Sequence, residues 1–204
     1  MRYYHACAKV GFVFPLPLST VFALLLSTAC TVHLVSDYDD QIDGGLTQAN
    51  TDITAFVNKM IDASGTPAGE YSQNKDFYTS ESAKLDSIRI RAEAHRALNS
   101  CPTTAAVKYA VISGMPQQPA NGPIPTLTAQ QVIAKLPEAD CGVVLISLIQ
   151  DAFGDLQSFH IAQGTKGIPA SAKDPILTGG LGSLIRSAIE VEVATKSGKS
   201  SGGS

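Results

Sequence analysis

The sequence predicts an all-α fold, a single domain like a four-helix bundle with a proline-rich loop between two of its helices. Apolar residues recur every three or four positions along four long stretches, which is the period of an amphipathic helix. Aromatic residues make up only 6% of the 204-residue chain and Trp is absent. A core built mainly from Ala, Leu, Ile and Val suits packed helices better than strands, where β-branched and aromatic residues dominate.

The first two helices are expected at 38–61 and at about 74–99. Ser36 or Asp37 can cap the start of the first helix, because their side chains can accept from its free backbone amides. The second helix is expected to bury the apolar stripe Phe77, Leu85, Ile88, Ala92 and His95. Its solvated side of mixed charge is formed by Lys84, Arg89, Arg91 and Arg96 with Glu81, Asp86 and Glu93.

Between these helices and the next long one the pattern is less regular. Residues 105–112 fit either a short helix or a buried extended piece, and 114–126 is predicted to be a loop because its four prolines exclude regular structure. Thr128 is expected to cap a short helix that ends at Leu136.

Two more long helices are expected in the C-terminal part. The first, at about 139–162, has the apolar stripe Leu145, Ile149, Phe153, Leu156 and His160. The second is expected to open at Asp174 and Pro175, an N-cap followed by a first-turn proline, and to run through Val191. Three glycines near its start, Gly179, Gly180 and Gly182, predict a close backbone approach to a neighbour.

The N-terminus has the features of a secretory leader. Arg2 and Lys9 precede an apolar stretch at 10–26, and small residues lead from there to Cys30. The stretch is shorter than the roughly 20 residues of a membrane span and contains two prolines, so we expect cleavage rather than retention.

Two interpretations of the cleavage before Cys30 remain open. The segment resembles a lipoprotein signal, in which Cys30 is acylated and becomes the new N-terminus, although Ser27 stands where that pattern has Leu. Ser27 and Ala29 also satisfy an ordinary secretory site. Lipidation of Cys30 is favoured, because an unmodified terminal thiol would be reactive in an oxidising compartment.

Cleavage of the leader also determines which of the other cysteines remain in the mature protein. Cys7 leaves with the leader, and Cys101 and Cys141 remain as an even pair that we predict to form a disulfide. Closing a loop of about 40 residues would stabilise the fold by roughly 4 kcal/mol. A metal or redox pair is disfavoured because the chain has no CxxC motif.

These readings give the domain boundaries: a leader at 1–29, a tether at 30–36, the helical bundle at 37–196 and a disordered tail at 197–204. The expected location is the cell envelope, with the protein anchored in the outer membrane and facing the periplasm. The alternative is a soluble periplasmic or secreted protein.

No catalytic, cofactor-binding or metal-binding residue is predicted, and the chain is not expected to be an enzyme. His95 and His160 lie on apolar stripes, but Ala92 and Gln157 stand where a di-iron site needs Glu, so both read as core histidines. The acids at 39–43 faintly resemble a calcium loop, yet Asn50 holds the place of its final Glu, and stabilisation of a helix start explains them better. The net charge of −3 argues against nucleic acid as a partner.

Four segments of the chain resemble an uncharacterised family of small bacterial exported helical proteins, many with lipoprotein leaders. The matching segments are YDDQIDGGLTQ from Tyr38, FYTSESAKLDSIRIRA from Phe77, FH at Phe159 and LIRSAIEVEVATKSG from Leu184. The resemblance implies an α-helical envelope protein and supplies no catalytic residues. The insert between Cys101 and Cys141 departs from it.

The expected function is that of a structural or interaction component of the envelope. Its partners would be the membrane, through lipid on Cys30, and another envelope protein that meets the basic side of the second helix or the proline-rich loop. The alternative is a carrier or binding module for a small hydrophobic ligand or lipid, with a pocket opened by Gly179, Gly180 and Gly182.

Overall fold

The computed structural model describes residues 39–96, 108–109, 111–112, 127–136 and 141–200, with 95–96 and 194–200 as backbone only. All regular structure in this part of the chain is helical, which confirms the all-α prediction. The four long helices are α1 (Asp40–Asp62), α2 (Lys75–Arg96), α5 (Cys141–Gln163) and α7 (Leu181–Ser200).

Short helices connect the long ones. Lys108, Tyr109, Val111 and Ile112 are helical, which favours the helix over the extended piece for this stretch. The short elements are the 3₁₀ helices η1 (Pro67–Gly69), η2 (Tyr71–Gln73), η3 (Gly164–Lys166) and η4 (Ala170–Ala172), and the α-helices α4 (Ala129–Lys135) and α6 (Lys173–Leu177).

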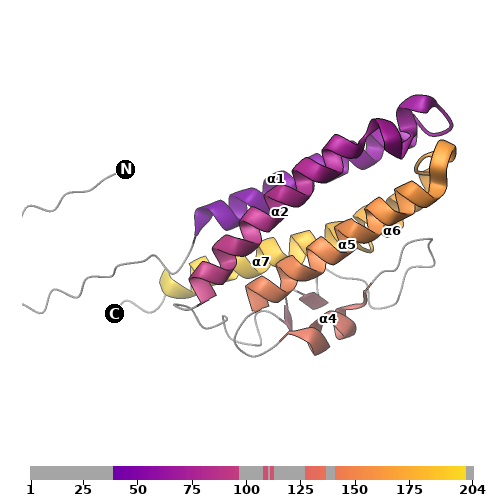
Figure 1. Cartoon of the computed structure of the whole chain (residues 1–204). Helices are drawn as coiled ribbons and strands as arrows, with labels where there is room; N and C mark the ends of the chain where they lie inside the picture. Colours follow the sequence, from indigo (N-terminus) through magenta and orange to yellow (C-terminus); the bar gives the residue numbers. More distant parts are fainter. Residues whose placement is uncertain (1–38, 97–107, 110, 113–126, 137–140, 201–204) are drawn as a thin grey trace, which may run out of the picture. The chain divides into compact units, whose positions relative to one another are not determined.

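The long helices pack in a closed ring. α1 packs against α2 and α7, and α5 packs against the same two helices. Figure 1 shows that α1 runs antiparallel to α2, and α5 antiparallel to α7, so that the α1–α2 turn and the α5–α7 turn lie at the same end of the bundle. This up-down arrangement is that of a four-helix bundle.

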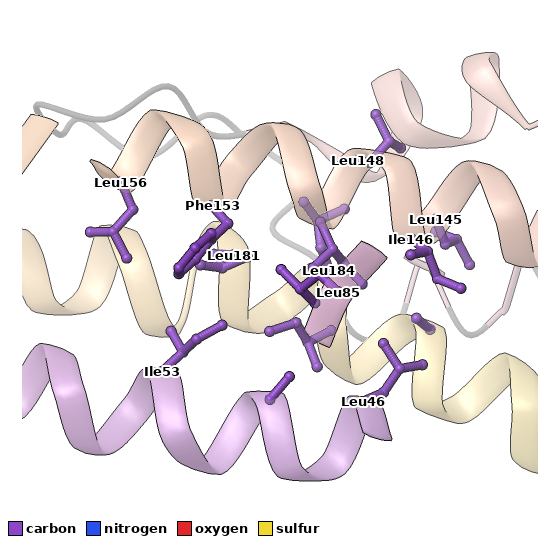
Figure 2. Close-up of a cluster of buried hydrophobic side chains, with 14 of the residues drawn as sticks. Leu46, Ile53, Leu85, Leu145, Ile146, Leu148, Phe153, Leu156, Leu181 and Leu184 are labelled. Carbon is purple, nitrogen blue, oxygen red and sulfur yellow. The ribbon is translucent and has the colours of Figure 1, made fainter. Parts of the chain in front are cut away.

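The core is apolar and is shared by all four helices. Figure 2 shows Leu46 and Ile53 of α1 pointing toward side chains of α5 and α7, with Leu85 of α2 beside Leu184. Each of these four side chains is fully buried, and each such burial contributes about 1.5–3 kcal/mol. No helix within the described ranges is long and apolar enough to span a membrane.

The N-cap residue Asp39 determines where α1 begins. Asp39 is extended, and its Oδ1 accepts a hydrogen bond of 3.0 Å from the amide of Gln41. The prediction of Ser36 or Asp37 as the cap is therefore wrong, because Asp39 already satisfies a free amide of the first turn.

The predicted short helix after the proline-rich segment is confirmed as α4. Thr128 caps it, accepting from the amide of Gln131 at 3.3 Å, while the Gln131 side chain accepts from the Thr128 amide at 2.8 Å. This reciprocal capping box fixes the start of α4, and Leu136 follows its last residue.

The single helix predicted from Asp174 is instead two helices. α6 ends at Leu177, and α7 begins at Leu181 after a break. The carbonyl of Asp174 accepts from the amides of both Thr178 and Gly179, which closes α6, and Arg186 donates to the Leu177 carbonyl at 3.0 Å. Gly179 and Gly180 lie in this break, where their low helix propensity favours an interruption.

The predicted close approach occurs at Gly182, and its neighbour is the preceding turn. A Cβ atom at Gly182 would lie 2.2 Å from the carbonyl oxygen of Leu177. α7 then continues to Ser200, so helix covers the first residues of the segment predicted as a tail. Residues 197–200 contain no proline that would end it.

We expect Gly182→Ala to destabilise the protein by about 1–3 kcal/mol, because the new methyl group would overlap the Leu177 carbonyl. Urea unfolding followed by circular dichroism measures the change. The matched control is Gly154→Ala in α5, where a Cβ would meet nothing within 4 Å and helix propensity should add up to about 1 kcal/mol of stability. Equal effects of the two substitutions would contradict the close approach.

Candidate functional site

The most elaborate polar site in the described chain lies inside the turn end of the bundle. It joins Tyr78 of α2, His160 of α5 and Gly69 of η1. The Tyr78 hydroxyl is 2.8 Å from Nδ1 of His160, and Nε2 of the same ring is 2.8 Å from the Gly69 carbonyl oxygen. Both side chains are buried, with exposed fractions of 1% for Tyr78 and 0% for His160.

The partners decide where the protons lie. The carbonyl of Gly69 can only accept, so Nε2 of His160 carries hydrogen and donates. In a neutral ring Nδ1 is then an acceptor, and the Tyr78 hydroxyl donates to it. Burial lowers the pKa of His160, partly offset by the hydrogen bond to Gly69, and burial likewise raises the pKa of Tyr78. Both groups are therefore neutral at neutral pH.

Aromatic rings enclose this pair. Phe56 of α1 stacks on Phe77 of α2 with ring centroids 3.8 Å apart, and Phe56 meets the Tyr78 ring edge-on. The Tyr71 ring lies edge-on to His160, and its hydroxyl accepts a hydrogen bond of 2.8 Å from Gln157. The packing leaves the ring of His160 without contact with solvent.

The two turns also meet directly through backbone atoms. The carbonyl of Lys166 accepts from the Ser64 hydroxyl at 2.7 Å and from the Gly65 amide at 3.0 Å. A Cβ atom at Gly167, where φ is +66°, would lie 2.9 Å from the Gly69 carbonyl oxygen. Gly69 therefore faces Gly167 on one side while its carbonyl accepts from His160.

Glu81 is the clearest departure from the sequence prediction. The prediction places it on the solvated side of α2, but its side chain is fully buried. Its Oε2 accepts from Lys84 Nζ at 2.9 Å, and Lys84 also reaches Asp52 of α1 at 2.8 Å. Oε1 has no hydrogen-bond partner. Burial raises the pKa of Glu81, although Lys84 acts in the opposite direction.

The rest of the basic side of α2 is neutralised within the protein. Arg91 contacts Asp39, the N-cap of α1, at 2.8 Å, and Arg89 pairs with Glu93 one turn further along α2. With Lys84 bound to Asp52, these cations contact acids of the protein itself. The side chain of Arg96 lies outside the described residues.

A partly buried acid, Glu192, lies in the second half of α7, away from the turn end. Burial, together with the charges of Asp43 and Asp39, raises the pKa of Glu192 to about 7. A Cβ atom at Gly142 would lie 3.4 Å from Oε1 of Glu192, so the carboxyl group approaches the first turn of α5. At neutral pH Glu192 is close to half protonated.

The predicted cysteine sites fall largely outside the described residues. Cys30 and Cys101 both lie there, so lipidation and the pairing of Cys101 stay predictions. Cys141, the first residue of α5, is buried and disulfide-bonded.

The structure also locates the residues weighed as ligands. His160 uses both ring nitrogens for Tyr78 and Gly69, while the side chain of His95 lies outside the described residues. Asp39 caps α1 and Asp43 lies within the helix, so neither belongs to a calcium loop. Within the described ranges, no three His, Cys, Asp or Glu side chains converge as a metal site would require.

Comparison of the chain with models of known protein families, with curated proteins and with solved structures finds no match. The resemblance to exported helical proteins therefore stays a prediction.

Sequence reasoning missed the roles of Tyr78 and Gly69. The buried positions of α2 are Tyr78, Glu81, Leu85, Ile88 and Ala92. Their spacing alternates between three and four, so a stripe started one residue later than Phe77 would have included both Tyr78 and Glu81. No sequence signal indicates that the Gly69 carbonyl faces His160.

We expect Glu81→Met to stabilise the protein by about 1 kcal/mol at pH 7, because it removes a buried carboxylate oxygen that has no hydrogen-bond partner. Lys84 keeps its ion pair with Asp52 in this variant. The pKa of Glu81 is raised above its ordinary 4.5, so ionisation weakens the folded state only as pH rises past that value. The gain should therefore be smaller at pH 4 than at pH 7.

Urea unfolding at the two pH values measures this difference. Glu93→Met on the exposed side of α2 is the matched control and should change stability by less than about 0.5 kcal/mol. A loss of stability in Glu81→Met at pH 7 would show that the carboxylate supports the fold.

Proposed function

We propose that this chain is exported to the bacterial cell envelope, is held at a membrane through lipid on Cys30, and acts there as a structural or interaction component. Its partner would be another envelope protein. The leader pattern at 1–30 supports export, and the helical bundle supports the architecture. Catalysis is not part of the proposal.

One observation carries the proposal: the polar groups inside the bundle are used to hold its own elements together. His160 links α2 and η1 through Tyr78 and Gly69. The amide of the Asn74 side chain donates to the carbonyls of Ala68 and Glu70 at 2.8 Å each. Groups committed in this way are poorly placed to act on a substrate, which favours a role exerted through the surface.

The ion pairs of α2 narrow the choice of surface. Lys84 and Arg91 bind acids of α1, so the basic side of α2 offers a partner little uncompensated charge. We therefore assign the partner contact to the proline-rich segment 114–126, which lies outside the described residues. Prolines restrict the backbone before binding, so such a segment loses little conformational entropy when a partner holds it.

The alternative role as a carrier was predicted from glycines that would leave room for a pocket. In the structure, Gly182 lies against the Leu177 carbonyl, and the Gly179 amide donates to the carbonyl of Asp174. These residues form the α6–α7 break. No observation on the described residues favours a hydrophobic ligand over the surface role.

We expect the mature protein, isolated from bacterial membranes, to begin at Cys30 with the added mass of a diacylglyceryl group. Cys30→Ser should abolish detergent-phase partitioning, because the lipid has no other attachment site. Cys7→Ser is the matched control and should have no effect, since Cys7 leaves with the leader. A wild-type N-terminus at an unmodified Cys30 would instead indicate ordinary secretory cleavage.

We expect a photo-crosslinking residue at Gln118 to capture an envelope protein in intact cells, because the proposal places the partner on segment 114–126. The same residue at Thr51, an exposed position of α1, is the matched surface control. A discrete adduct should form from position 118 alone. Adducts from position 51 alone, or from neither position, would contradict this surface while leaving membrane anchoring unaffected.

A further inference from the structure

We propose that His160 is a proton-operated latch, which fastens the turn between α1 and α2 onto α5 near neutral pH and releases it on acidification while the rest of the bundle stays folded. The latch turn is defined here as residues 64–74, from the end of α1 through η1 and η2. Its function as a switch is independent of the membrane anchor and of the partner.

The latch depends on one ring that serves two elements. His160 donates from Nε2 to the Gly69 carbonyl in the latch turn and accepts at Nδ1 from Tyr78 on α2, each at 2.8 Å. Of the two neutral forms, only the one with hydrogen on Nε2 can donate to Gly69 while it accepts from Tyr78. In this uncharged form the ring joins the latch turn and α2 through α5.

Adding a proton disrupts this arrangement. A protonated Nδ1 would donate to the Tyr78 oxygen, so the hydrogen of the Tyr78 hydroxyl would lose the acceptor that it has in the neutral form. The imidazolium charge would also be buried without a counter-charge, which is costly. Opening of the turn relieves both costs by returning the ring to water.

The surroundings offer no compensation for that charge. The titratable groups that face the ring are Tyr78 on α2 and Tyr71 in η2, and neither side chain has a carboxylate that could balance a positive charge. Phe56 is the residue that faces it from α1. Glu70, the acid within the latch turn, accepts a hydrogen bond from the Ser72 hydroxyl.

Besides His160, the latch turn is held by hydrogen bonds from Ser64 and Gly65 to the Lys166 carbonyl and from Gln157 to the Tyr71 hydroxyl. The amides of Gly69 and Asn74 make only short-range bonds, to Thr66 and Tyr71, and residues 64–68 are exposed. The four long helices share a large apolar core instead. Local opening of a weakly held segment therefore requires less free energy than unfolding of the whole bundle.

The direction of the pH response follows from linkage. Burial lowers the pKa of His160 below its ordinary 6.5, and the opened turn restores that value. Opening therefore takes up a proton below about pH 6.5, so the closed state is stable above this pH and loses stability as pH falls. If the closed state binds no proton, the opening constant rises about tenfold between pH 7.5 and 5.5.

Hydrogen exchange of the purified protein at these two pH values tests the latch. After correction for the intrinsic pH dependence of exchange, the amides of Gly69 and Asn74 should show the tenfold rise in opening, while the core amides of α1 at 46–57 should show none. His160→Gln keeps an amide that can donate to Gly69 and cannot titrate, so its latch-turn amides should lose the pH response.

Two further measurements keep the proposal testable if His160→Gln fails to fold. Nitrogen chemical shifts of the wild-type ring should report hydrogen on Nε2 and a transition below pH 6.5. Glu192→Gln, a matched change of a partly buried titratable group on α7, should leave the response of the latch turn intact. A ring with hydrogen on Nδ1, or an equal rise in opening for the latch turn and for α1, would overturn the latch.

Discussion

Burial of α7 organises the packing of the bundle. Between Leu181 and Val191 only Arg186 and Glu190 are exposed, because α1 and α5 lie along the helix and α6 lies against its start. Small side chains at 182, 183, 187 and 188 keep this helix narrow enough for its neighbours to approach. Each of the other long helices is then positioned by the stripe that it buries, since none could keep an apolar face in water alone.

The polar groups within the bundle lie at its margins and between pairs of helices. Asp39 joins the start of α1 to Arg91 of α2, and Lys84 joins the same two helices through Asp52. At the turn end, His160 and Tyr78 connect elements far apart in the sequence. Paired polar groups of this kind contribute less to net stability than the apolar core, but they specify which elements meet.

Periodicity was sufficient to predict most of the fold. The stripe Leu145, Ile149, Phe153, Leu156 and His160 is buried as expected, and Thr128 caps α4. The predicted stripe of α2 started one residue early, which placed Glu81 on the wrong face. A charged residue is usually exposed, so composition alone argued against the buried position that Lys84 makes possible.

The candidate site could not be predicted in the same way. His160 was expected in the core, but its partners are a hydroxyl from α2 and a backbone carbonyl of η1. Every residue has a backbone carbonyl, so the sequence does not indicate which one accepts from His160. The approach of Gly69 to His160 depends on how two turns fold together. The break between α6 and α7 was missed for a related reason, because a helix-start signal at Asp174 does not reveal how soon the helix will end.

The contact between the two turns restricts how this architecture can vary. Gly69 has the Ala63 carbonyl 2.4 Å from its virtual Cβ, and Gly167 has the Gly69 carbonyl at 2.9 Å, so neither position has room for a side chain. An insertion in one turn would displace the backbone that the other turn contacts, and the lengths of both turns are thereby coupled. Divergent sequences with this fold should share the two glycines together with Tyr78 and His160, a combination by which remote relatives can be recognised.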